Sequence, residues 1–254
     1  MQANRKISEY DLVTQNWGKI KDEKYSVVVL PWGAVEPHNY HLPYFTDCYL
    51  SHAVACDSAD YANEHLGVKA MVLPPVVYGA QNPGQWNKAF CIHPRFETQK
   101  AILEDIVHSL YRQGFRNLLI VNGHGGNTFR PMIRDLAFTY PDFRILSMEW
   151  WTVLPHSDYF EAEVDEHGGE LETSAMMHYY PELIDLSTAG DGIVKPFNIA
   201  AVENKKAWTP RHWDAITDDT GLGNPKKASA EKGKQFVEDV IPIIAEVIAE
   251  LGKE

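Results

Sequence analysis

The sequence predicts an α/β protein, a three-layer αβα sandwich around a mainly parallel sheet. Short apolar segments rich in β-branched residues alternate with longer segments whose apolar residues recur at helical spacing. This alternation is typical of parallel sheets covered by helices. Polar residues follow the apolar segments, at the sheet edge where the carboxyl ends of parallel strands meet. With 254 residues, 44% of them hydrophobic, the chain suits a single domain spanning 1–254.

Four segments are expected to be strands because each is short, apolar and bounded by polar or turn residues: 26–30, 68–77, 117–121 and 143–148. Helical spacing of apolar residues predicts five helices: 47–66, 97–112, 128–138, 175–180 and 228–251. We expect Asn127 to cap the third helix. Segments 152–166 and 186–225 show no clear period, and the first of them is expected to form a mobile flap.

Composition limits the partners and the compartment. The formal net charge of −12 argues against nucleic acid or an anionic membrane surface as a partner. No apolar run approaches the ~18 residues of a membrane helix. Residues 1–6 lack the apolar stretch of a secretory signal. Cys48, Cys56 and Cys91 are odd in number and show no CxxC spacing, so a disulfide framework is not expected. These features predict a cytoplasmic protein.

The loop after the first expected strand carries the richest chemistry. Glu36, His38, His41 and Asp47 lie close together in the sequence, in a segment stiffened by three prolines. Further potential ligands occur as His124, His167, Glu170 and Glu172. A mixed set of imidazoles and carboxylates suits Zn²⁺, Mn²⁺ or Fe²⁺ better than Ca²⁺ or Mg²⁺. The inventory is large enough for two ions that share one carboxylate.

Each of these residues also has a purely structural interpretation. Asp47 at a helix start is more often only an N-cap, and His41 and His93 are better explained as polar loop residues. The glycine-rich turn 122–127 could cradle a phosphate, although the dinucleotide pattern is incomplete and no Walker-type lysine follows. Covalent catalysis is disfavoured because no GxSxG occurs and the cysteines lack a nearby His–Asn pattern.

Four blocks of the sequence closely resemble the creatininase (creatinine amidohydrolase) family. They are Gly33–His38 with Leu42-Pro43 and Thr46-Asp47, then Asn122–Asn127, then His167–Ser174, and finally Gly223–Pro225 with Ala228–Gly233. The resemblance implies a creatininase-like αβα sandwich, a homohexamer, and a binuclear metal centre that hydrolyses C–N bonds of cyclic amides or formamides.

The resemblance also implies roles for individual residues. Glu36 and His124 would hold one metal ion and His38 the other, with Asp47 bridging the two. The last ligand of creatininase stands where this chain has Gly126, so we assign Glu170 as its replacement. His167 matches the family's proton-transfer histidine, and a further role as acid/base or as orienting group is assigned to Glu172.

Departures from the family bear on the substrate. Where creatininase has a tryptophan that closes over the ring of its substrate, this chain has Glu163. We expect Tyr78, Gly125, Trp150 and Trp151 to contact the substrate, the tryptophans by stacking on a planar group and the glycine by allowing close approach of the backbone.

The resulting hypothesis is a hydroxide bridging two divalent ions (Zn, Mn or Fe) that attacks an amide carbon, with His167 delivering a proton to the leaving nitrogen. The alternatives are a deformylase or peptidase-like enzyme of the same family, and a small-molecule-binding protein with a single structural metal. Nucleotide binding is a third and less favoured alternative.

Overall fold

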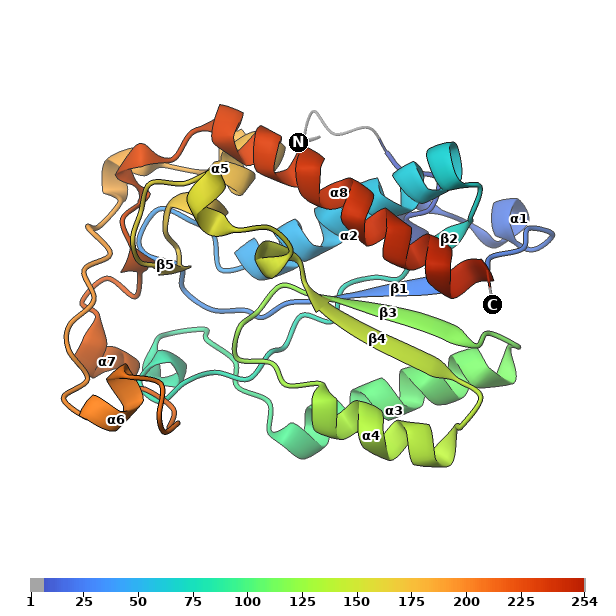
Figure 1. Ribbon diagram of the computed structural model, residues 1–254, viewed down its shortest axis with the longest axis horizontal. Coiled ribbons are helices and arrows are strands. Elements are labelled where there is room, and N and C mark those ends of the chain that lie inside the picture. Colours follow the sequence, from blue (N-terminus) through green and yellow to red (C-terminus); the bar gives the residue numbers. More distant parts are fainter. Residues whose placement is uncertain (1–6, 254) are drawn as a thin grey trace.

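A four-stranded parallel sheet forms the centre of the protein (Figure 1). The computed structural model describes residues 7–253; residues 1–6, to which the expectation about a secretory signal refers, and residue 254 lie outside the described part. The strands are β1 (Val27–Trp32), β2 (Ala70–Val72), β3 (Asn117–Asn122) and β4 (Arg144–Glu149). Their order is β2-β1-β3-β4, and every neighbouring pair is parallel.

Helices cover both faces of this sheet (Figure 1). One face carries α2 (Thr46–Leu66), α5 (Glu170–Tyr179) and α8 (Ala230–Lys253), and the other carries α3 (Phe96–Arg112) and α4 (Arg130–Thr139). Because side chains alternate along a strand, β1 contributes to two separate cores. The predicted three-layer α/β architecture is confirmed.

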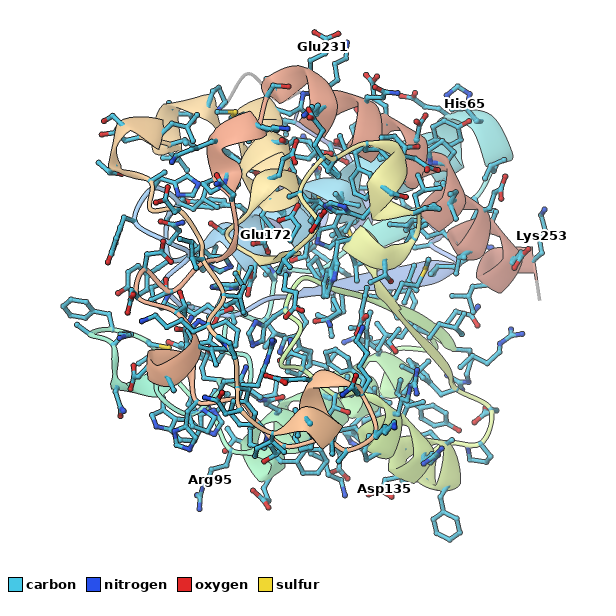
Figure 2. All side chains as sticks on the ribbon, turned by 60° about the vertical axis from the view of Figure 1, so that its left-hand side comes forward. His65, Arg95, Asp135, Glu172, Glu231 and Lys253 are labelled. Carbon is cyan, nitrogen blue, oxygen red and sulfur yellow. The ribbon has the colours of Figure 1, made fainter. Side chains whose placement is uncertain are left out.

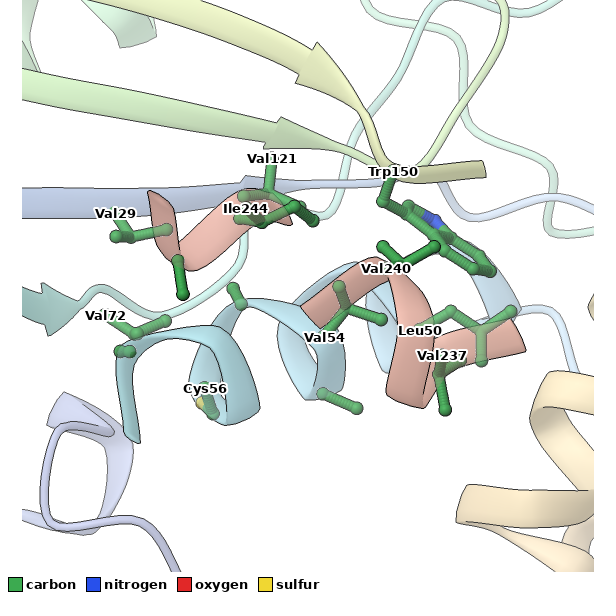
Figure 3. Packing of buried hydrophobic residues seen from close by; sticks show 14 of the residues in the cluster. Val29, Leu50, Val54, Cys56, Val72, Val121, Trp150, Val237, Val240 and Ile244 are labelled. Atoms are coloured by element: carbon green, nitrogen blue, oxygen red, sulfur yellow. The ribbon is translucent and has the colours of Figure 1, made fainter. Parts of the chain in front are cut away.

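The core between the sheet and α2 and α8 is the larger of the two (Figure 3). Val29 and Val121 reach into it from the sheet, Val54 from α2, and Val240 and Ile244 from α8. On the opposite face, the alternate β1 residues pack with α3 and α4. Burial on both faces of β1 and β3 explains why these strands are continuous apolar runs in the sequence.

Smaller elements gather beyond the carboxyl ends of the strands. The strands β5 (Asp165–His167) and β6 (Leu222–Gly223) form an antiparallel pair. Near them in Figure 1 lie the short helices α6 (Ala200–Glu203) and α7 (Trp213–Ile216), whereas α1 (Trp17–Ile20) lies at the other end. Short 3₁₀ helices occupy Leu12–Thr14, Gln85–Asn87, Trp150–Thr152, His156–Asp158, Pro181–Leu183, Leu186–Thr188 and Pro225–Lys227.

Three local expectations need correction. The second strand is confined to 70–72 because Pro74 and Pro75 cannot continue its hydrogen bonding. Helix α5 begins at Glu170, five residues earlier than the apolar pattern suggested, with two glutamates in its first turn. The side chain of Asn127 does not cap α4; it accepts from the Ala80 N–H instead. Within residues 7–253 we find no helix with the length and hydropathy to cross a membrane.

Candidate metal centre

Six potential ligands converge at the carboxyl end of the sheet. Glu36 and His38 follow β1, Asp47 lies in the first turn of α2, His124 follows β3, His167 ends β5, and Glu172 lies in the first turn of α5. All of them except Glu172 are at least nine-tenths buried. Figure 2 labels Glu172 near the middle of the molecule, beside the start of α5. We call these six residues the strand-end cluster.

Asp47 lies between two groups of ligands. Glu36, Asp47 and His124 form one group whose ligand atoms lie within 4.8 Å of one another, and His38, Asp47 and Glu172 form a second. One Asp47 oxygen, Oδ1, lies 2.8 Å from His38 Nε2, and the other, Oδ2, lies 3.1 Å from His124 Nδ1. A carboxylate that faces a different histidine with each of its oxygens could be shared by two metal ions.

Each histidine of the strand-end cluster uses one ring nitrogen to bond a backbone carbonyl. His38 Nδ1 lies 3.1 Å from the Glu36 oxygen, His124 Nε2 lies 2.7 Å from the Ala80 oxygen, and His167 Nε2 lies 2.9 Å from the Pro37 oxygen. A carbonyl only accepts, so these nitrogens carry the hydrogen and the other nitrogen of a neutral ring has a lone pair. That lone pair faces the cluster, as in histidines that bind metals.

Two carboxylate oxygens in the strand-end cluster have no hydrogen-bond partner among the described residues. They are Glu36 Oε1 and Asp47 Oδ2, both buried. Glu36 Oε1 nevertheless lies 2.8 Å from His124 Nδ1, so these two atoms need either a proton or a metal ion between them. The other Glu36 oxygen is held by Gln85 Nε2 at 3.0 Å. The residues therefore fit divalent ions, and without metal the site must hold protons.

The pKa values in the metal-free cluster reflect the same need for positive charge. Burial opposes a charge on His38, but the carboxylates of Asp47 and Glu172 outweigh it and raise the pKa of His38 to about 10. Against burial, Glu36 likewise raises the pKa of His124 well above its usual value. Burial raises the pKa of Glu172 to about 7. In the absence of metal, imidazolium ions balance the carboxylates.

The structure does not bring Glu170 to the strand-end cluster. Its side chain is fully buried, and its Oε2 accepts from the backbone N–H groups of Glu161 and Ala162, each at 2.9 Å. Its Oε1 pairs with Lys232 of α8 at 2.5 Å. Residues two apart on a helix point in nearly opposite directions, so Glu172, rather than Glu170, reaches the cluster. Glu170 instead anchors the segment 152–166, which we expected to be a mobile flap.

Gly123 and Gly126 in the turn 122–127 allow close packing of the backbone on neighbouring segments, rather than close approach of a substrate. A Cβ at Gly126 would collide with the Ala80 carbonyl and lie 2.5 Å from His124 Nε2, so no ligand side chain fits there. A Cβ at Gly123 would collide with the Asp47 carbonyl at the start of α2. Apart from its chain neighbours, Trp151 is the only described residue within 4 Å of a Cβ built at Gly125, and Gly125 lines the cavity.

A cavity of about 530 Å³ opens over the strand-end cluster. Of the expected substrate contacts, Gly125 and Trp151 line it. Trp150 does not, because it is 1% exposed and packs in the core on Phe236. Tyr78 is not among the lining residues either; its carbonyl accepts from the Trp32 indole at 3.2 Å.

Several lining residues were not anticipated from the sequence. They are Trp208, Arg211 and Trp213 from the irregular segment 186–225. Gln81 and Gln85, which also line the cavity, lie in a polar turn at the sheet edge where the sequence predicts a site. The only sequence signal for the three residues of segment 186–225 is the density of aromatic and cationic residues within six positions. No periodicity could have placed them at the cavity.

Comparison with known proteins identifies the family. A family model described as creatinine amidohydrolase matches residues 14–248. The chain belongs to the creatininase family. The curated creatinine amidohydrolase of Pseudomonas putida is 28% identical over 246 residues, covering 88% of this chain and 89% of that protein. A mycofactocin precursor peptide peptidase of Mycobacterium ulcerans is 26% identical, covering 84% of this chain and 81% of its own length.

Solved structures agree with this assignment. A crystal structure from Bacteroides fragilis, of a protein named as a candidate creatinine amidohydrolase, is 56% identical with a TM-score of 0.96, and 98% of each chain is covered. A manganese form of creatininase is 25% identical with a TM-score of 0.72, covering 95% of this chain and 98% of its own. The protein is thus a creatininase-family hydrolase with residues suited to divalent metal ions.

Proposed function

We propose that this protein is an amidohydrolase that uses two divalent ions (Zn, Mn or Fe) to hydrolyse a C–N bond of a cyclic amide or formamide. One observation carries the proposal. Three histidines each fix one ring nitrogen on a backbone carbonyl and present the other to carboxylates, two of whose buried oxygens have no partner among the described residues. Buried carboxylate oxygens need positive charge beside them, and bound metal ions would supply it while the histidines stay neutral.

The groups of ligands suggest how the ions would be held. Glu36 and His124 would hold one ion, His38 and Glu172 the other, and Asp47 both. Glu172 replaces Glu170 as the last ligand in this assignment. When bound, the two ions would supply an activated water at neutral pH and polarise the substrate carbonyl.

His167 is placed to move a proton at the cavity wall. Its Nε2–H is fixed on the Pro37 carbonyl, and its ring lies between His38, with centroids 4.1 Å apart, and Trp213, 5.5 Å away. In the metal-free protein, burial and the neighbouring His38 charge lower the pKa of His167 to about 4. Because Nε2 carries the hydrogen, Nδ1 of the neutral ring has the lone pair that would accept a proton and then deliver it to the leaving nitrogen. Trp151 and Trp213 limit the access of water.

Metal content and turnover test the proposal together. Protein purified without chelator is expected to hold close to two ions per chain and to hydrolyse a member of a panel of cyclic amides and formamides. Asp47→Ala is expected to lose both properties, because it removes the shared ligand. One ion in the wild type that survives Asp47→Ala would contradict the proposal and indicate a single structural metal.

A peptidase acting on a modified peptide is the second candidate. It is favoured by the similarity to a mycofactocin precursor peptide peptidase, which covers most of the chain. Cleavage of peptide amides, with the cyclic amides and formamides left intact, would select it. The homohexamer and the cytoplasmic location stay predictions.

A further inference from the structure

The side chain of Gln81 is an unpartnered amide in the wall of the cavity. It is 6% exposed, and neither its Oε1 nor its Nε2 has a partner among the described residues. Its backbone is firmly held, because the Gln81 N–H donates to His93 Nδ1 at 2.8 Å. The preceding Ala80 carbonyl accepts from His124 Nε2. A buried amide without partners destabilises a fold, and its position beside a ligand residue indicates a role in binding.

A positively charged side chain, that of Arg211, lies in the part of the cavity wall formed by segment 186–225. Arg211 is the only lysine or arginine among the residues that line the cavity. Its Nη2 pairs with Glu166 Oε2 at 2.6 Å, and the two side chains are 33% and 54% exposed. Only this one of its five N–H groups has a hydrogen bond to a described residue. Such a solvated pair is weak enough for another carboxylate to replace Glu166.

Aromatic rings accompany this cation. The Arg211 guanidinium lies 5.7 Å from the Trp213 ring, and Trp213 in turn packs edge-on against His167. Trp208 lines the cavity yet is 84% exposed, so its ring contributes little to the core. An exposed ring at a cavity wall offers a stacking surface for a planar ligand.

We propose that the substrate is a planar amide that carries a carboxylate. Gln81 would pair with the adjacent N–H and C=O of the amide edge, Arg211 would bind the carboxylate, and Trp208 would stack on the planar group. The reaction at this site rests on the proposed function. The chemistry of recognition follows from Gln81 and Arg211 themselves, one offering a matched donor and acceptor and the other a fork of donors suited to a carboxylate.

Binding of matched probes tests the carboxylate subsite without requiring turnover. The probes are 5-oxoproline against 2-pyrrolidinone, and hydantoin-5-acetate against hydantoin, measured by calorimetry with the metal-loaded protein. Each acid is expected to bind about tenfold more tightly than its neutral partner, as charge-assisted hydrogen bonds allow. Arg211→Gln is expected to remove this preference and to leave the binding of the neutral amides unchanged.

Glu166→Gln is the matched variant, because it breaks the same ion pair from the other side. It is expected to keep or strengthen the binding of the acids, since it removes the competitor for Arg211. If the Arg211–Glu166 ion pair only held segment 186–225 in place, both substitutions would weaken the binding of all four probes, and the proposal would be wrong. Absence of binding by every probe at 10 mM, or equal binding of acids and neutral amides, would overturn it as well.

Asp47→Ala, which is expected to remove the metal ions, distinguishes binding of the probe's carboxylate to Arg211 from its binding to metal. The preference for acids is expected to persist in this variant and still to depend on Arg211. A preference that disappears with the metal and ignores Arg211→Gln would contradict the proposed subsite. Lack of metal or of hydrolysis in the wild type, with the Arg211-dependent preference intact, would contradict only the proposed function.

Gln81→Met and Gln99→Met form a second matched pair. Gln99 lies on α3 away from the cavity, is 1% exposed, and also has an unpartnered Nε2. Gln81→Met is expected to weaken the binding of all four probes about tenfold while Tm stays equal or rises. Gln99→Met is expected to leave binding unchanged. A lower Tm with unchanged binding in Gln81→Met would show that the amide is structural.

Discussion

Two groups of potential metal ligands adjoin helix α2, and they differ in how their atoms are used. The strand-end cluster includes Asp47 from the first turn of this helix. Asp11, His52 and Cys56, which we call the helix triad, also bring their ligand atoms within 4.8 Å of one another. In the helix triad, His52 Nε2 lies 3.0 Å from Asp11 Oδ1 and 3.6 Å from Cys56 Sγ. His38 Nε2 of the strand-end cluster likewise lies 2.8 Å from Asp47 Oδ1, so a contact between imidazole and carboxylate does not by itself distinguish the two groups.

The difference teaches that proximity of ligand atoms does not by itself make a metal site. Asp11 Oδ1 accepts from the Val13 N–H at 3.0 Å as well as bonding His52, so it needs no cation. In the strand-end cluster the backbone carbonyls occupy the far side of each imidazole ring and leave the near side to an ion. Backbone acceptors behind the histidines, more than residue type, separate the two groups.

The largest expected effect comes from a pair of glutamates within one helix turn. Glu172→Gln is expected to lose the ion held with His38 and to lower kcat by about 10³-fold or more, a loss of several kcal/mol of charge stabilisation. Glu170→Gln is expected to keep both ions and to lose stability, because it weakens the pairing with Lys232. Metal analysis, turnover and urea unfolding of both variants check this.

The opposite pattern, with ions lost in Glu170→Gln and retained in Glu172→Gln, would return the ligand role to Glu170. Equal loss of metal from both variants, each still folded, would show that position on the helix does not decide which glutamate binds.

A smaller effect on activity is expected from His167. His167→Ala should retain both ions, because two other ligands and the shared Asp47 serve each metal group, and should lower kcat by about 10²- to 10⁴-fold through loss of proton transfer. Metal content and kcat measured over a range of pH check this. Full activity in the variant would remove His167 from the mechanism, and loss of an ion would make it a ligand.

The sheet, and the edge at which most potential ligands lie, could be predicted because they depend on local pattern. The run Ser26–Leu30 is apolar at every position after the serine, as a strand buried on both faces requires. The carboxyl ends of parallel strands meet at one edge, so Glu36, His38 and His124 could be placed at the same edge because each follows an expected strand.

The choice between Glu170 and Glu172 could not be predicted, because it depends on where α5 begins. Gly168 lies at a φ of +58°, a conformation that favours glycine, immediately before that start. The partner of Glu170, Lys232, lies on the distant α8. The part of the cavity wall formed by segment 186–225 is likewise fixed by long-range contacts, such as the hydrogen bond from the Trp213 backbone N–H to the Pro83 carbonyl at 2.7 Å. Sequence periodicity carries no information on such contacts.

Protonation of the metal-free strand-end cluster predicts a pH dependence of stability. The pKa of His38 rises to about 10 in the fold, against about 6.5 for an unfolded histidine. Its stabilisation is therefore complete below about 6.5 and is lost as pH rises toward about 10. His124, with a raised pKa, acts in the same direction. Chelator-treated protein is expected to lose about 1 kcal/mol of unfolding free energy per pH unit between about pH 7 and 9 from His38, and a further loss from His124.

Metal-loaded protein is expected to lack this loss, because ions replace the protons and bind more tightly as pH rises. Urea unfolding at several pH values, with and without chelator, measures both slopes. Parallel slopes for the two forms would contradict the assignment of the protons to the metal ligands. Below about pH 7 the shifts of His167 and Glu172 act in opposite directions, so the higher window gives the clearer test.

The smallest effect is expected in the helix triad. His52→Gln weakens the hydrogen bond to Asp11 and is expected to lower the free energy of unfolding by about 1 kcal/mol. Because the triad satisfies its own polar atoms, metal content and kcat should equal those of the wild type. Metal analysis and urea unfolding of this variant test whether the helix triad binds metal, with Glu172→Gln as the positive control for loss of an ion. Loss of an ion from His52→Gln would mean that an imidazole whose other nitrogen is not bonded to a backbone carbonyl can still bind metal, and the distinction drawn from the backbone carbonyls would not hold.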